Sequence, residues 1–178
     1  MKRNFKQHTL KLAQASAFAL CAVAAGGNSY AANDTAAATA TVITPIAITK
    51  SRDLVFGKFA PGAGGSITIS TSGAPTVSGV IRSTTVTPTS AKFDVTGDDT
   101  ATYSITHSGT TVLTSGEDTM ALAKYSDLTG AGAVSGNVTS GTLGASGQSV
   151  YVGGTLTVGA AQAAGAYTGT VIVTVEYN

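Results

Sequence analysis

The chain has 178 residues, of which 43% are apolar and only 11% are charged, and its formal net charge is +1. So small a charge provides no field for attracting nucleic acid. Low charge combined with a positive mean hydropathy excludes a solvated, disordered chain, and the length predicts one domain or two very small ones.

The first residues have the layout of a secretory signal peptide. A basic start is followed by a mostly apolar stretch, Ala13 to Ala25, and then by small residues that suit cleavage after Ala31 or Ala32. The apolar run of about 13 residues is too short for a membrane anchor, which needs roughly 20. Cys21 would suggest a lipoprotein signal, but Leu20 stands before it where lipoprotein peptidases require a small residue.

Removal of residues 1–31 changes the charge balance of the chain. Four of the ten basic residues leave and no acidic ones do, so that the mature chain has a net charge of −3 and no cysteine. An exported domain without a disulfide depends on other sources of stability. About 147 residues are enough to bury a full hydrophobic core.

The mature chain is typical of many short strands and tight turns. Thr, Ser, Gly and Val are abundant, and no segment has a convincing helical period, although residues 159–166 could form one helical turn. Apolar residues alternate with polar ones over residues 66–70, 91–95 and 103–106, and again over residues 150–158, where Gly153-Gly154 indicates a bulge.

The last part of the chain contains a long loop and the most regular strand. Residues 130–147 are rich in Gly, Ser and Ala and predict a surface loop with one weak strand around Val134 to Val138. Residues 167–177 form one apolar face and one face of mostly hydroxyl side chains. Seven or more such strands, separated by Gly-containing turns, predict a two-sheet antiparallel β-sandwich.

The two ends of the mature chain suggest an incomplete sandwich. The sequence stops at Asn178, directly after the regular strand, and we expect that strand to lack a neighbour on one side. The leading segment has small apolar side chains at alternate positions, which suit insertion into a narrow groove: Ala36, Ala38, Ala40 and Val42. The alternatives are that residues 167–177 form an interior strand of a complete sandwich and that the leading segment is a floppy leader.

Three segments carry a recognisable pattern: Leu54-Val55-Phe56-Gly57-Lys58, Phe93-Asp94-Val95, and the ending from Gly165 to Tyr177, in which Gly-x-Tyr precedes alternating apolar residues. Together they resemble the sequences of chaperone–usher pilus subunits, closest to the archaic branch and to related secreted pilin-like domains. The resemblance covers nearly the whole mature chain, and the ending is its most specific part. Many such pilins carry a disulfide near the start of the domain, which this chain lacks.

The resemblance implies an all-β fold, an immunoglobulin-like antiparallel β-sandwich that lacks its final strand and is completed by donor-strand exchange. Residues 32–43 would be the N-terminal donor-strand extension, and residues 44–178 the pilin-like domain. The edge that accepts the donor would contain Tyr167, Val171, Val173, Val175 and Tyr177. In this family basic residues of the chaperone hold the C-terminal carboxylate, here that of Asn178.

The function implied is that of a structural subunit of a bacterial surface fibre, a pilus or fimbria, serving adhesion or biofilm formation. Its partners would be a periplasmic pilus chaperone, an outer-membrane usher and neighbouring subunits in a homopolymer. The protein would be exported through the periplasm to the cell surface, with no membrane insertion after cleavage and no nucleic-acid partner. The alternative is a self-contained secreted β-sandwich that binds a ligand such as a glycan.

Nothing in the residue pattern predicts an enzyme, a metal site or a cofactor. The one histidine of the mature chain, His107, stands beside Ser108-Gly109 and is interpreted as part of a surface turn, without the base and acid that a catalytic triad needs. The acidic residues lack the spacing of a calcium loop and are interpreted as solvated turns: Asp94, Asp98, Asp99, Glu117 and Asp118.

Overall fold

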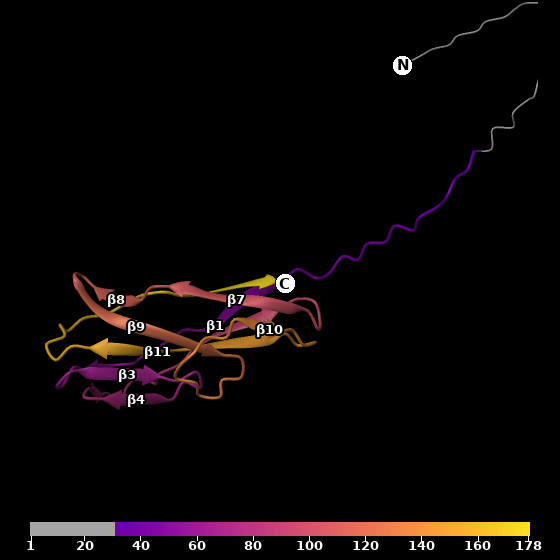
Figure 1. The fold of residues 1–178 in the computed structure, drawn as a ribbon. Helices are drawn as coiled ribbons and strands as arrows, with labels where there is room; N and C mark the ends of the chain where they lie inside the picture. Colours follow the sequence, from indigo (N-terminus) through magenta and orange to yellow (C-terminus); the bar gives the residue numbers. More distant parts are fainter. Residues whose placement is uncertain (1–30) are drawn as a thin grey trace, which may run out of the picture. The chain divides into compact units, whose positions relative to one another are not determined.

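A computed structural model describes residues 31–178, so the predicted signal peptide lies outside the described residues except for Ala31. The chain divides into two units after Ala40, and residues 41–178 form the second, compact unit. Of the first unit, the described residues 31–40 are exposed and form no helix or strand. All the described strands belong to the second unit (Figure 1).

The described part of the chain contains twelve strands and no helix, which confirms the all-β prediction. The strands are β1 (Ala47–Arg52), β2 (Phe59–Ala60), β3 (Gly65–Ile69), β4 (Pro75–Ser78), β5 (Ile81–Arg82), β6 (Ala91–Thr96), β7 (Thr102–Gly109), β8 (Val112–Ser115), β9 (Asp118–Asp127), β10 (Ser140–Thr142), β11 (Gln148–Val158) and β12 (Val171–Tyr177). Within residues 31–178 no helix is long and apolar enough to cross a membrane.

The larger sheet is built around β11, which is the longest strand. The first half of β11 pairs with β6 and its second half with β3, so that β6 and β3 follow one another along the same edge. Its other edge pairs with β9. Strand β1 continues the sheet beyond β6, β4 continues it beyond β3, and β8 continues it beyond β9. All these pairings are antiparallel, as the alternation of apolar and polar residues predicts.

The second sheet has the order β10–β7–β12 and faces the first to form a β-sandwich, as predicted. The two sheets join along one side, because the chain leaves β7 and enters β8, which belongs to the larger sheet. Thr110 and Thr114 of this crossing still bond to Thr170 and Thr168, just before β12. Residues 168–177 are therefore paired along one edge with a continuous stretch of chain.

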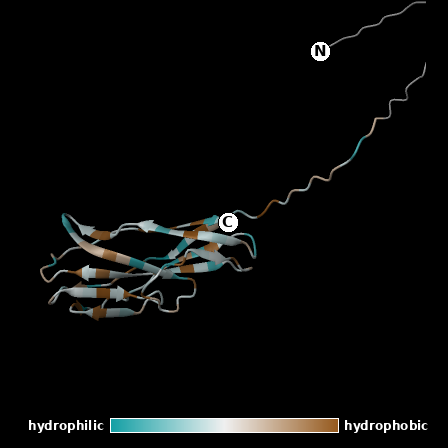
Figure 2. Cartoon of the chain, viewed as in Figure 1, coloured by the Kyte–Doolittle hydropathy of each residue, from teal (hydrophilic) through white to brown (hydrophobic). Residues whose placement is uncertain are grey.

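The inward-facing apolar residues form two clusters. The first core lies between β6, β7, β11 and β12 and consists of Ala91, Phe93, Val95, Tyr103, Ile105, Leu143, Val150, Val152 and Val173. The second core lies towards the other end of β11 and consists of Phe56, Ile67, Ile69, Val80, Met120, Leu122, Leu156 and Val158. Apolar residues alternate with polar ones along the strands (Figure 2), so that each strand buries one face.

The structure corrects three local predictions. The strand in the long loop is β10, at residues 140–142, whereas residues 134–138 form none. The two glycines Gly153-Gly154 continue β11 without a shift of register, so they form no bulge. Residues 159–166 make only a hydrogen-bonded turn from Gln162 N to Gly159 O, because glycines flank the alanines.

The glycine-rich loop covers part of the outer face of the large sheet. Its backbone accepts hydrogen bonds from the chain beneath it, from Thr71 N to Ala133 O and from Ser126 N to Gly136 O. Under the loop, the hydroxyl of Tyr125 donates to Ile69 O at 2.9 Å. A Cβ atom at Gly153 would lie 2.4 Å from the Tyr125 ring, so a glycine is required there.

Candidate functional site

The second edge of β12 is unpaired in the described part of the chain. Strand β12 bonds to β7 over seven register pairs, from Val171–Gly109 to Tyr177–Tyr103, and no other strand of residues 31–178 pairs with it. A strand at a sheet edge presents a row of free N–H and C=O groups, which is a template for pairing with another chain.

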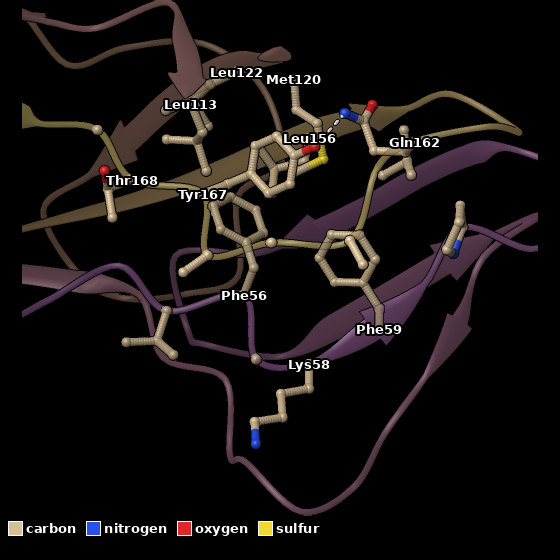
Figure 3. Close-up of a pocket in the computed structure, with 18 of the residues that line it drawn as sticks. Phe56, Lys58, Phe59, Leu113, Met120, Leu122, Leu156, Gln162, Tyr167 and Thr168 are labelled. Carbon is tan, nitrogen blue, oxygen red and sulfur yellow. Dashed lines mark hydrogen bonds between the residues drawn. The ribbon is translucent and has the colours of Figure 1, made fainter. Parts of the chain in front are cut away.

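An apolar groove of about 820 Å³ lies beside the start of this edge. One wall is the chain after β1, Leu54 to Pro61, and the other is the chain leading into β12, Gln162 to Gly169 together with Val171. The floor consists of second-core residues and one neighbour, namely Leu113, Met120, Leu122, Leu156 and Val158. The groove therefore opens directly onto the second core (Figure 3).

The first wall is formed by the Leu-x-Phe-Gly element. Phe56 is 8% exposed and packs into the second core, and Leu54 contacts both cores. The facing glycine of β11, Gly154, makes room for them, because a Cβ atom there would lie 3.1 Å from both side chains. Gly57 follows with a φ of +82°, a conformation that glycine adopts at little cost, and turns the chain away from the core.

The second wall is an arch of small residues held by one tyrosine. The hydroxyl of Tyr167 accepts a hydrogen bond from Gln162 Nε2 at 2.7 Å and donates one to Ala163 O at 2.9 Å. The same ring packs against the second core, close to Phe56 across the groove (Figure 3). The alanines and glycines between Gln162 and Tyr167 offer no bulky side chain that would close the groove.

At the other end of β12 the strand is bonded to the chain just before β1. The hydroxyl of Tyr177 donates to Thr44 O at 2.7 Å and accepts from Asp98 N at 2.6 Å. Gly97 makes room for this ring, because a Cβ atom there would lie 2.2 Å from the Tyr177 hydroxyl. This contact, which we call the Thr44 latch, holds the chain just before β1 against the end of β12.

The predicted acceptor residues occupy different environments. Tyr167 and Val171 line the groove, whereas Val173 is buried in the first core. Val175 and Tyr177 pack against the first core, beyond the groove. The structure thus places only the first two of these five residues at an open apolar surface, a distinction that strict alternation along the strand could not reveal.

The predicted donor residues form no strand and are exposed: Ala36, Ala38, Ala40 and Val42. Val42 is 96% exposed, more than any other exposed large apolar side chain of residues 31–178, and the neighbouring Ile43 is 47% exposed. Asn178 is exposed, and its backbone N–H donates to Thr102 O at 3.2 Å.

His107 lies inside the sandwich, which contradicts its interpretation as part of a surface turn. It belongs to β7 and faces inward beside Val173, because the strand extends as far as Gly109. Its buried Nε2 has no hydrogen-bond partner within residues 31–178. Burial, and then the nearby Lys124 ammonium, lower the pKa of His107 below its usual 6.5. The alternation along β7 could have predicted this position, because His107 continues the inward-facing register of Tyr103 and Ile105.

Asp94 is likewise not part of a turn. It lies in β6, on the outer face, where it accepts hydrogen bonds from Ser51 and Ser149 and pairs with Lys92 at 2.9 Å. These contacts, the serine hydroxyls first, lower the pKa of Asp94 to about 2. Among residues 31–178 no three His, Cys, Asp or Glu side chains gather into a possible metal site.

The family of the chain follows from a comparison of sequences. Residues 46–177 match the model of a family described as a domain of unknown function, DUF4402. The match spans most of the chain and nearly all of the sandwich, so the chain belongs to the DUF4402 family. No curated protein matches it.

Proposed function

We propose that this DUF4402 domain is a structural subunit of a bacterial surface fibre that assembles by donor-strand exchange. In such a fibre the leading segment of one copy, residues 32–43, would pair with the free edge of β12 in the next copy. The observation that carries the proposal is the apolar groove beside an unpaired strand edge.

The leading segment has the properties that this edge requires. It is unpaired and exposed, and from Thr35 to Thr49 it contains no charged residue that would have to be desolvated. From Ala36 to Val42 the side chains of one register are all apolar. Eleven extended residues span about 36 Å, enough to follow the eleven residues from Tyr167 to Tyr177.

Burial of this register would contribute a modest hydrophobic term. Three alanine methyl groups and one valine side chain give on the order of 4 kcal/mol as an upper estimate. Pairing would also satisfy the free backbone groups of β12, which a buried edge cannot leave unpaired. The groove would provide the apolar surface that the donor side chains contact, and the backbone groups of β12 would align the added strand through hydrogen bonds.

A chaperone and an usher belong to this proposal as partners. A subunit with an open groove exposes part of its second core and an unpaired edge, a combination that favours aggregation. A periplasmic chaperone would cover that surface before assembly, and the outer-membrane usher would exchange it for the next subunit. Export to the cell surface and a role in adhesion or biofilm formation are parts of the same proposal.

The proposal is tested by comparing the mature chain with a variant that lacks residues 32–43. We expect the complete chain to form heat-resistant polymers, and the variant to form none even when a synthetic peptide of residues 32–43 is added, because the free peptide can fill a groove but cannot link two copies. Binding of the peptide should raise the unfolding temperature of the variant. If both proteins are stable, folded monomers that ignore the peptide, the chain is a self-contained domain, and ligand binding, for example to a glycan, becomes the function to test.

A further inference from the structure

We infer that Val42 of one copy fills the groove of another, and that a chain cannot place its own Val42 there. This inference rests on the proposed function and specifies which residue meets which surface. It follows from three features of the described residues: the position of the groove along the edge, the uneven size of the leading side chains, and the Thr44 latch.

The acceptor edge is deep at one end and filled at the other. The groove reaches from the arch before β12 as far as Val171 and includes none of the later residues of that strand. Beyond it, Val173 is buried in the first core and Tyr177 is bonded to Thr44. Only an incoming side chain near Val171 therefore meets a large apolar space, whereas one near Tyr177 meets a surface that is already packed.

The leading segment is bulky at one end and small at the other. In its apolar register three alanines, at positions 36, 38 and 40, are followed by the larger Val42. Val42 is also nearly fully exposed in the chain itself. A space lined by Phe56, Leu113 and Met120 gains more from a valine than from an alanine, because apolar contact grows with the area that is buried.

The Thr44 latch prevents a chain from making this match with its own groove. Thr44 is held at the Tyr177 end of β12, and Val42 lies two residues away, within about 7 Å of it. From Tyr177 back to Val171 the strand measures about 20 Å, which is six residue steps. A leading segment that folded back on its own body could bring only residues near Ala36 to the groove.

A second copy is free of this constraint. If its leading segment runs antiparallel to β12, Val42 lies opposite Val171 and Ala36 opposite Tyr177. The seven residues Ala36–Val42 then match the seven residues of β12, and the large and small side chains meet the deep and filled parts of the edge. The fit of side-chain size thus selects both the antiparallel direction and the intermolecular pairing.

The test uses engineered cysteine pairs in the mature chain, residues 32–178, which has no cysteine of its own, so that the introduced thiols are the only ones. Copies with Val42→Cys are mixed with copies that carry Leu113→Cys, a groove residue, and oxidised after assembly. The matched control replaces Val42→Cys with Ala36→Cys and keeps the same partner. A disulfide needs Cα atoms within roughly 7 Å of each other, so each pair reports on a specific contact.

We expect the Val42→Cys mixture to give a reducible heterodimer with one copy of each variant, identified by a mass tag on the Leu113→Cys copy, and the Ala36→Cys mixture to give no such heterodimer. A dimer from the Ala36→Cys mixture would reverse the inferred direction while leaving strand exchange intact. Polymers that form without either dimer would show that Val42 does not enter the groove. If the mature parent chain without introduced cysteines forms no polymer, the proposed function itself fails.

Discussion

The substitution Tyr177→Phe removes the Thr44 latch by deleting a single oxygen atom. The variant keeps the ring against the first core and loses two hydrogen bonds, to Thr44 O and from Asp98 N. At about 0.5–1.5 kcal/mol net for each bond, the free energy of unfolding should fall by about 1–3 kcal/mol. For a domain of this size the unfolding temperature should fall by roughly 3–9 °C.

The location of the effect is as informative as its size. Loss of the latch should speed amide hydrogen exchange at the start of β1, which begins three residues after Thr44. The control is Tyr167→Phe, whose hydroxyl also makes two hydrogen bonds, but only within the arch from Gln162. It should leave exchange in β1 unchanged. The reasoning is refuted if Tyr177→Phe changes neither stability nor exchange, or if both variants loosen β1 equally.

Three other predictions concern single positions. The pKa of His107 in the folded state lies below its unfolded value of about 6.5. The contribution of neutral His107 to the free energy of unfolding should therefore be fully present above pH 6.5 and be lost as the pH drops through the folded pKa. His107→Leu should reduce this loss, as measured by denaturant titrations between pH 7 and 5. Gly153→Ala should lower the free energy of unfolding by about 1–3 kcal/mol through overpacking against Tyr125. Gly144→Ala should be nearly neutral in the same titration, because its Cβ atom would meet only Gly147 O, at an ordinary contact distance of 3.9 Å. Val42→Ala should leave the unfolding temperature of the monomer unchanged, because the side chain is exposed, and should lower the heat resistance of the polymers; equal resistance of both polymers would argue against a buried valine.

The sequence was sufficient to predict the fold class and to locate five of the twelve described strands. The alternation at residues 66–70, 91–95 and 103–106 corresponds to β3, β6 and β7, because half-buried strands expose every second side chain. The predicted end of β7 was wrong. Ser108-Gly109 was interpreted as a turn, whereas the strand continues to Gly109. Local turn preferences cannot show that the strand is extended by pairing with β12, which lies far away in the sequence.

The candidate groove could be predicted only in part. The regular ending marked the correct strand, and Leu-x-Phe-Gly marked one wall. The depth of the groove depends on how the chain after β1 and the chain leading into β12 are arranged, and on glycines such as Gly154 that admit Leu54 and Phe56. Both features depend on contacts between segments that are distant in the sequence, and the periodicity of a single strand cannot predict such contacts. The donor segment and the signal peptide stay predictions.

The long ladder between β12 and β7 has a mechanical consequence for a fibre. If a neighbouring copy pulls on β12 from its free edge, the force runs parallel to the strand and loads the seven register pairs together, in shear. Bonds loaded in this way must break almost simultaneously, whereas a hairpin pulled apart from its end opens one bond at a time. Strand β12, which would carry the load between copies, is therefore bonded to β7 in the shear arrangement that resists tension best.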